Sequence, residues 1–338
     1  MEETQCQDPI AELIVTYKEL NGSTIEELYE EPSPLEFMRY VAKNTPFVVR
    51  GAASNWKATK TWSAKYLEEY LRGETVNVAV TPVGNADAPT PQGPDGSLVF
   101  AKPWEEDQQF GEFLNYVVQQ EQGDSQKQQN TEVRYAQTQN DNLRHEYASL
   151  FNHVQQDIPF ARIALQRDPE AINMWIGNSR SVTALHKDNY ENIYVQIAGR
   201  KHFALLPPLC HPCVNEQRLK PAHYERSSSS SSGTEEEIVP PLRLELENDG
   251  ETVPFAIWDP DRPAENATEY SHLAEPMRVT LEPGDMLYLP CMWYHKVSQS
   301  CSPEGICVAV NYWYDMEFGG PLYPLSNFVR SVSKMNKT

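Results

Sequence analysis

The sequence predicts a mainly β protein with flanking helices, built around a barrel or sandwich. From residue 172 onward, short apolar runs alternate with turn signals such as Ala198-Gly199 and Glu282-Pro-Gly-Asp285. Strands that are short and evenly punctuated indicate a closed or stacked sheet structure. The chain has 338 residues, of which 40% are hydrophobic, so it can bury a large core.

The first 170 residues mix helices with short strands. Apolar residues at helical spacing predict a helix over residues 9–20, and Ser33-Pro34 begins a second one. A β-rich run spans residues 46–51 and ends at a glycine. A further helix is expected over residues 61–71, and residues 76–80 alternate as a strand does.

Three segments have the composition of loops. Residues 82–98 are rich in Gly, Pro, Asp and Ala, and residues 117–131 are polar and glutamine-heavy. Residues 226–237 contain six consecutive serines followed by acidic residues. Such a low-complexity run predicts a disordered insert.

The C-terminal residues predict an amphipathic helix. Leu325, Phe328, Val329 and Val332 stand at positions i, i+3, i+4 and i+7, so one apolar stripe must meet the body of the protein or another subunit. A closed dimer is the commonest soluble assembly. The stripe is therefore the candidate interface of a homodimer.

Composition and charge exclude several classes of protein. The formal net charge is −20, which argues against a nucleic-acid partner. No apolar run reaches the ~18 residues of a membrane-spanning helix, and the acidic N-terminus does not resemble a secretory signal. Six cysteines are sparse for this length, so we expect reduced thiols in a cytosolic or nuclear protein. Cys210-His-Pro-Cys213 has redox-motif spacing but lacks the βαβ context of such motifs.

One constellation of residues points to metal chemistry. His186-Lys-Asp188 stands at a strand-like run, where residues i and i+2 project from the same face. A third ligand must come from a distant strand, and His295 follows the strand-like run 285–289. Two histidines and one carboxylate form the facial triad of non-haem Fe(II) oxygenases. Taken alone, each histidine is more often an ordinary hydrogen-bonded residue of the core or surface, and the surrounding residues reverse that weighting.

Polar side chains in otherwise apolar strands support a cosubstrate site beside this triad. Lys201 lies in the strand-like run 201–206, where its ammonium could meet the distal carboxylate of a keto acid. The alternative for Lys201 is an exposed position on a surface strand. Buried polar groups need partners, and a dicarboxylate would supply them. The other members of this polar set are Thr183, Asn192, Tyr194 and Asn311.

These motifs resemble those of the Jumonji-C (JmjC) family of 2-oxoglutarate oxygenases. The motifs that carry the resemblance are Thr183-Ala-Leu-His-Lys-Asp-Asn-Tyr-Glu-Asn-Ile-Tyr194, Gly199-Arg-Lys-His-Phe203, Pro283-Gly-Asp-Met-Leu-Tyr-Leu-Pro290, Trp293-Tyr-His295 and Val308-Ala-Val-Asn-Tyr-Trp-Tyr314. The match runs from about residue 8 to residue 330 and is interrupted by the serine-rich insert.

The resemblance implies a fold and a set of site residues. The fold would be a double-stranded β-helix, or cupin-like jelly roll, over residues 171–318, with residues 1–170 packed on it and a C-terminal helix in residues 319–338. His186, Asp188 and His295 would bind Fe(II). Lys201, helped by Thr183 and Tyr135, would bind 2-oxoglutarate, and O2 would be the second cosubstrate. Asn192, Tyr194 and Asn311 would line the same site.

Within the family, the sequence looks most like a cytoplasmic (3S)-lysyl hydroxylase that acts on developmentally regulated GTP-binding proteins. Three alternatives remain open: an N-methyl-lysine histone demethylase, a metal-dependent endopeptidase on methylated histone tails, and a non-catalytic binding module. The complete triad and Lys201 disfavour the last. The absence of a reader domain weakens the demethylase interpretation, and an intact keto-acid site argues against the peptidase interpretation.

Overall fold

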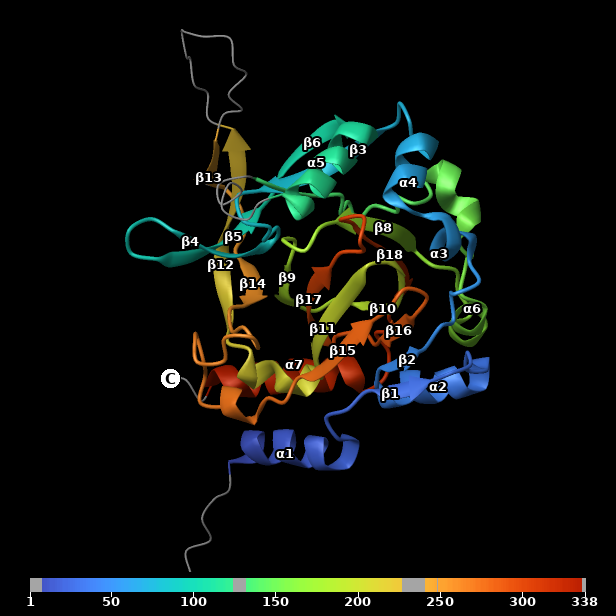
Figure 1. Ribbon diagram of the computed structural model, residues 1–338. Coiled ribbons are helices and arrows are strands. Elements are labelled where there is room, and N and C mark those ends of the chain that lie inside the picture. The colour runs from blue at the N-terminus through green and yellow to red at the C-terminus, as the bar shows by residue number, and fades with distance from the viewer. Residues whose placement is uncertain (1–7, 124–131, 227–240, 248, 336–338) are drawn as a thin grey trace, which may run out of the picture.

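Two β-sheets with apposed inner faces form the centre of the molecule (Figure 1). This computed structural model describes residues 8–123, 132–226, 241–247 and 249–335. The larger sheet has the strand order β1 (Glu26–Leu28), β2 (Phe47–Val49), β16 (Met286–Leu289), β10 (Tyr190–Ala198), β18 (Cys307–Asp315) and β8 (Ala171–Gly177). The smaller sheet has the order β15 (Met277–Leu281), β11 (Arg200–Leu206), β17 (Tyr294–Ser300) and β9 (Thr183–His186). The predicted mainly β fold of the jelly-roll type is confirmed.

Two smaller sheets and a set of helices surround this centre (Figure 1). One sheet has the order β13 (Leu242–Leu246), β12 (Glu216–Arg226), β5 (Ser97–Lys102) and β4 (Ala88–Gln92), with β14 (Val253–Ala256) paired to β12. The other has the order β6 (Trp104–Gln109), β3 (Thr75–Thr81) and β7 (Val133–Tyr135). The α-helices are α1 (Pro9–Asn21), α2 (Pro34–Lys43), α3 (Lys57–Thr61), α4 (Ala64–Tyr70), α5 (Phe110–Gln122), α6 (Pro159–Leu165) and α7 (Leu322–Met335). Short 3-10 helices are η1 (Ala148–His153), η2 (Pro208–Cys213) and η3 (Ser271–Leu273).

Within the described ranges, every helix is too short or too polar to cross a bilayer.

The two faces of the larger sheet have different neighbours. Ile193 and Val195 of β10 point outward into an apolar cluster that includes residues of α2, α4, α5 and α6. Tyr194 points inward and meets the ring of Phe203 on β11, with ring centroids 5.2 Å apart. Because side chains alternate along a strand, the helices seal the outer face and leave the inner face for a polar site.

Several predictions for the N-terminal part are confirmed. Residues 9–20 lie within α1, residues 46–51 contain β2 and residues 76–80 lie in β3. Ser33 caps α2 in a capping box with Glu36. The helix expected over residues 61–71 is α4, which begins at Ala64 because the Ser63 side chain accepts from the Tyr66 amide; Thr61 instead ends α3.

Two predicted loops contain regular structure. Residues 82–98 include β4, whose Pro89 and Pro91 suggested a loop. Proline is tolerated there because β4 is the edge strand of its sheet. The glutamine-heavy stretch continues α5 through Gln122, since Val117 and Gln120 are buried and glutamine is a good helix former. The rest of that stretch, residues 124–131, lies outside the described residues.

The remaining expectations have mixed outcomes. Arg226 ends β12, whereas the serine-rich insert at residues 227–237 lies outside the described residues. The terminal helix is confirmed as α7, with Val329 buried but Leu325 and Phe328 56% and 64% exposed. Cysteines in the described residues are free thiols, including the pair in η2. The larger sheet takes β1 and β2 from the N-terminal part, so the division at residue 170 stays a prediction.

Candidate active site

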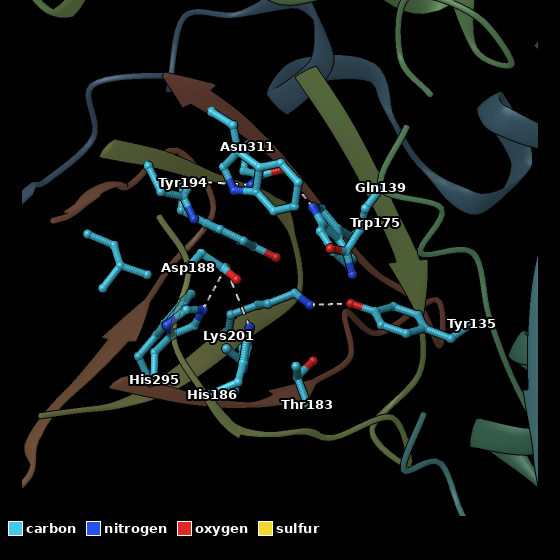
Figure 2. A pocket seen from close by; sticks show the side chains of 15 residues that line it. Tyr135, Gln139, Trp175, Thr183, His186, Asp188, Tyr194, Lys201, His295 and Asn311 are labelled. Atoms are coloured by element: carbon cyan, nitrogen blue, oxygen red, sulfur yellow. Dashed lines mark hydrogen bonds and ion pairs between the residues drawn. The ribbon is translucent and has the colours of Figure 1, made fainter. Parts of the chain in front are cut away.

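His186, Asp188 and His295 meet between the two sheets (Figure 2). His186 ends β9 and lies directly opposite His295 in the antiparallel pairing of β9 with β17. Asp188 follows two residues later, with its Oδ2 atom 3.6 Å from the Nε2 atoms of both histidines. One candidate ligand atom from each residue lies within 4.8 Å of the others. The strand pairing thus brings together residues that are far apart in sequence.

Backbone contacts fix the orientation of both imidazoles. His186 Nδ1 lies 2.8 Å from the Ala184 carbonyl oxygen, and His295 Nδ1 lies 3.1 Å from that of Trp293. A carbonyl only accepts, so each Nδ1 carries the proton and donates. The Nε2 lone pairs are left facing Asp188, which is the tautomer that a metal ligand requires.

The three residues change each other's affinity for protons. Burial raises the pKa of Asp188, but the two histidines outweigh it and bring the value to about 2. Burial lowers the pKa of His186, yet the facing carboxylate of Asp188 leaves it above its ordinary value. Burial and the neighbouring His186 lower the pKa of His295 to about 4. The carboxylate is therefore charged and His295 neutral at pH 7.

Lys201 places a buried cation deeper in the same pocket. It is 2% exposed, and its Nζ donates to the Tyr135 hydroxyl at 2.7 Å (Figure 2). Among the described residues, no carboxylate pairs with this ammonium. Tyr135 reaches it past Gly177, where a Cβ would lie 2.5 Å from the tyrosine ring. A buried cation without a counter-charge is costly, so the pocket suits an anionic ligand.

A chain of hydrogen bonds crosses the floor of the pocket. Asn311 on β18 donates to Asn192 on β10 at 3.2 Å and accepts from the Trp175 indole at 2.9 Å. Tyr194 stands opposite Asn311 in the β10–β18 register. The Trp175 indole, both polar atoms of Asn311 and the Asn192 amide oxygen are thereby paired and held in place.

The structure gathers every metal-ligand and cosubstrate residue predicted from the sequence into one pocket. Its lining includes the triad and all six proposed cosubstrate residues, namely Tyr135, Thr183, Asn192, Tyr194, Lys201 and Asn311. The sequence analysis missed Gln139, Trp175 and Trp313, which line it as well. Trp175 could have been found, because it alternates with Asn173 and Gly177 on the inner face of β8. Gln139 lies outside the named strands and gave no such signal.

Comparisons with known proteins agree with this geometry. The cupin-like domain matches residues 32–320. Lysine-specific demethylase JMJ32 of Arabidopsis thaliana is 37% identical over 320 residues, which cover 92% of this chain and 87% of that protein. JmjC domain-containing protein E of Dictyostelium discoideum is 33% identical, covering 92% and 89%. The chain belongs to the cupin-like JmjC family.

A human relative is similar to the same extent. Bifunctional peptidase and (3S)-lysyl hydroxylase JMJD7 of Homo sapiens is 36% identical over 293 residues, which cover 86% of this chain and 84% of that protein. The family is one of oxygenases that generally use Fe(II) and 2-oxoglutarate. The resemblance read from the sequence motifs is confirmed at this level. Relatives named for different reactions are equally close, so similarity alone does not select the reaction.

The residues of this pocket can hold both Fe(II) and 2-oxoglutarate, which the family generally uses. Two Nε2 atoms and one carboxylate oxygen form the donor set that suits Fe(II) with open positions. Lys201 is a buried ammonium that lacks a carboxylate partner among the described residues, as a dicarboxylate cosubstrate requires. The two features lie in one pocket.

The pKa values of the histidines predict how divalent metal binding depends on pH. A protonated imidazole has no lone pair, so metal and proton compete. Because the pKa of His186 is raised and that of His295 lowered to about 4, His186 is protonated first as the pH falls. We expect affinity for Co(II), an air-stable probe, to drop by about tenfold per pH unit on the acid side of the raised His186 pKa.

Calorimetric titration at a series of pH values measures this dependence. The exposed His145 provides the matched control, and His145→Ala should leave the profile unchanged. Affinity that stays constant from about pH 7.5 to about pH 5.5 would contradict the role of His186.

Proposed function

We propose that this protein is an Fe(II)- and 2-oxoglutarate-dependent oxygenase that hydroxylates a lysine side chain of a protein substrate. The observation that carries the proposal is the joint presence of the His-Asp-His triad and the buried Lys201 in one pocket. A peptidase needs the metal but no keto acid, and so gives no reason for a buried ammonium at this place.

The proposal assigns each group a role. His186, Asp188 and His295 would hold the iron, and Lys201 with Tyr135 and Thr183 would hold the distal carboxylate of 2-oxoglutarate. When bound, Fe(II) and 2-oxoglutarate supply the oxidation of an unactivated C–H bond by O2. The side chains of this protein would orient the bound metal and cosubstrate and shield them from solvent. The carbonyls of Ala184 and Trp293 hold both imidazoles in the ligand tautomer.

The lining of the pocket also restricts what can reach the site. Asn311 donates to the Asn192 amide oxygen and accepts from the Trp175 indole, so these polar atoms are already paired within the protein. Tyr194 and Phe203 close the pocket where the two sheets meet. A preorganised pocket of low polarity strengthens each electrostatic contact with a bound ligand.

A lysine of a cytosolic GTP-binding protein is the proposed target. Support comes from the human relative named as a (3S)-lysyl hydroxylase, and from the resemblance to a hydroxylase of developmentally regulated GTP-binding proteins. The net charge of −20 favours encounter with a basic segment. The free cysteines fit a cytosolic or nuclear location. Demethylation of a methylated lysine is the second candidate, because the Arabidopsis relative is named as a demethylase.

Lys201→Ala tests the cosubstrate assignment. Without the ammonium, the distal carboxylate would be buried unpaired, so the 2-oxoglutarate concentration for half-maximal succinate formation should rise by at least about thirtyfold. Iron affinity should change little. Lys220→Ala, an exposed lysine on β12, is the control and should match the wild type. An unchanged requirement for 2-oxoglutarate in Lys201→Ala would remove the assignment.

Mass spectrometry distinguishes the competing reactions. The protein is loaded anaerobically with Fe(II) and 2-oxoglutarate, and oxygen is then admitted with either of two peptides. An unmodified lysine peptide of a developmentally regulated GTP-binding protein should gain one oxygen atom. A methyl-lysine histone peptide should release no formaldehyde. Formaldehyde without oxygen incorporation would favour demethylation, and cleavage without 2-oxoglutarate would favour the peptidase. His186→Ala is the inactive control for the oxidative reactions.

We also propose a homodimer that α7 holds together. Leu325 and Phe328 are exposed on this helix, while Val329 packs against the body. Burying two such large side chains against a second copy would remove apolar surface from water. Sedimentation should give a dimer for the wild type and a monomer for Phe328→Asp, with Ser331→Asp on the same helix as control. A wild-type monomer at micromolar concentration would rule the interface out.

A further inference from the structure

A second cavity opens on two of the three triad residues from outside the cosubstrate pocket. It measures about 510 Å³, and the residues that it shares with that pocket are Gln139, Trp175, Thr183, His186 and Asp188. Phe100 and Phe255 line it and contact each other with ring centroids 5.2 Å apart. A cavity that has the metal ligands in its wall is the place where a substrate side chain would meet them.

Two of the three carboxylates in this cavity already have cationic or imidazole partners. Asp188 faces the two histidines of the triad. Glu216 pairs with Arg330, with Lys334 at 3.0 Å and with His211 at 3.5 Å. Neither is therefore available to a cationic substrate.

Asp87 is the third carboxylate, and it forms no ion pair within the described part of the chain, although His186 and Lys102 lie near enough to interact with it electrostatically. It accepts one hydrogen bond, from the Gln137 side-chain amide at 3.2 Å. The nearby Lys102 is engaged with Glu247 at 2.8 Å, and within the described part of the chain no lysine or arginine forms an ion pair with Asp87. Burial raises the pKa of Asp87. A charged carboxylate in this position would be stabilised by a ligand that brings a cation.

Other charges in the cavity leave Asp87 as the attractive position for a cation. Lys187 lies over the ring of Tyr294, with its Nζ atom 5.4 Å from the ring centroid. It also interacts electrostatically with Glu216, which forms an ion pair with Arg330. Lys187 and Arg330 thus form a basic group in the cavity. A positively charged side chain is repelled by this basic group and attracted by Asp87.

We propose that Asp87 binds the side-chain ammonium of the substrate lysine and so selects lysine that carries N–H donors over trimethylated lysine. This inference rests on the proposed lysyl hydroxylation and deepens it. An ammonium offers three donors, which the Asp87 carboxylate and the Gln137 amide oxygen can accept. A trimethylammonium offers none, so Asp87 would keep only its hydrogen bond from the Gln137 amide and the Gln137 amide oxygen would gain none. Asp87 is thus a specificity-determining residue rather than a metal ligand.

Asp87→Asn removes the charge with little change in shape. Asp87 has a positive φ of 53°, and asparagine adopts this left-handed conformation as readily as aspartate does. The neutral amide can keep the contact with Gln137. Asp95→Asn, on the exposed turn between β4 and β5, is the matched control.

The first measurement needs no catalysis. Ligand-observed NMR with n-pentylammonium, a mimic of the lysine side chain, measures its binding to the wild type and to both variants. Asp87→Asn should weaken binding by about tenfold, the scale of one charge-assisted hydrogen bond. Asp95→Asn should not weaken it, and pentan-1-ol should not distinguish the three proteins. Equal pentylammonium binding by the wild type and Asp87→Asn, or none by the wild type, would overturn the proposal.

The second measurement separates this inference from the proposed reaction. With a lysine peptide of the GTP-binding protein, Asp87→Asn should raise KM by about tenfold and leave kcat nearly unchanged. Asp95→Asn should leave both KM and kcat at the wild-type values. If no peptide is hydroxylated by any protein, the proposed function fails, and the pentylammonium titration still decides the role of Asp87.

Discussion

The antiparallel pairing of β9 with β17 is the interaction on which the site depends. It sets His186 opposite His295 across 109 residues of sequence, and it lets Asp188 follow into the space between them. The next strand of that sheet is β11, which carries Lys201 into the same interior. A register shift of one residue in β9 would turn both His186 and Asp188 to the other face, because side chains alternate along a strand.

Buried charged side chains without an ion-pair partner indicate where the interior binds ligands. Some buried polar groups are satisfied within the protein, as the bonds that join Asn192, Asn311 and Trp175 illustrate. Lys201 has no carboxylate partner, and Asp87 has no cationic one, within the described residues. Burying an unpaired charge costs several kcal/mol. The two groups are of opposite sign and line neighbouring cavities, so together they suit an anionic cosubstrate and a cationic substrate.

Sequence patterns predicted the strands and the triad because both depend on local periodicity and residue type. Local patterns failed where tertiary context decides: β4 carries prolines that only an edge position tolerates, and α5 continues through glutamines because Gln120 is buried. The role of Tyr135 came from resemblance, since only the approach past Gly177 explains how it reaches Lys201. Asp87 gave no signal in the sequence, because what distinguishes it is burial without a cation.

A crystal structure of the protein with Mn(II) and 2-oxoglutarate, grown without oxygen, tests the central claim most directly. The account predicts the metal at the Nε2 atoms of His186 and His295 and at the carboxylate of Asp188. It also predicts the distal carboxylate of 2-oxoglutarate on the Lys201 ammonium and the Tyr135 hydroxyl. A metal bound elsewhere, or a cosubstrate whose distal carboxylate does not contact Lys201, would contradict the account.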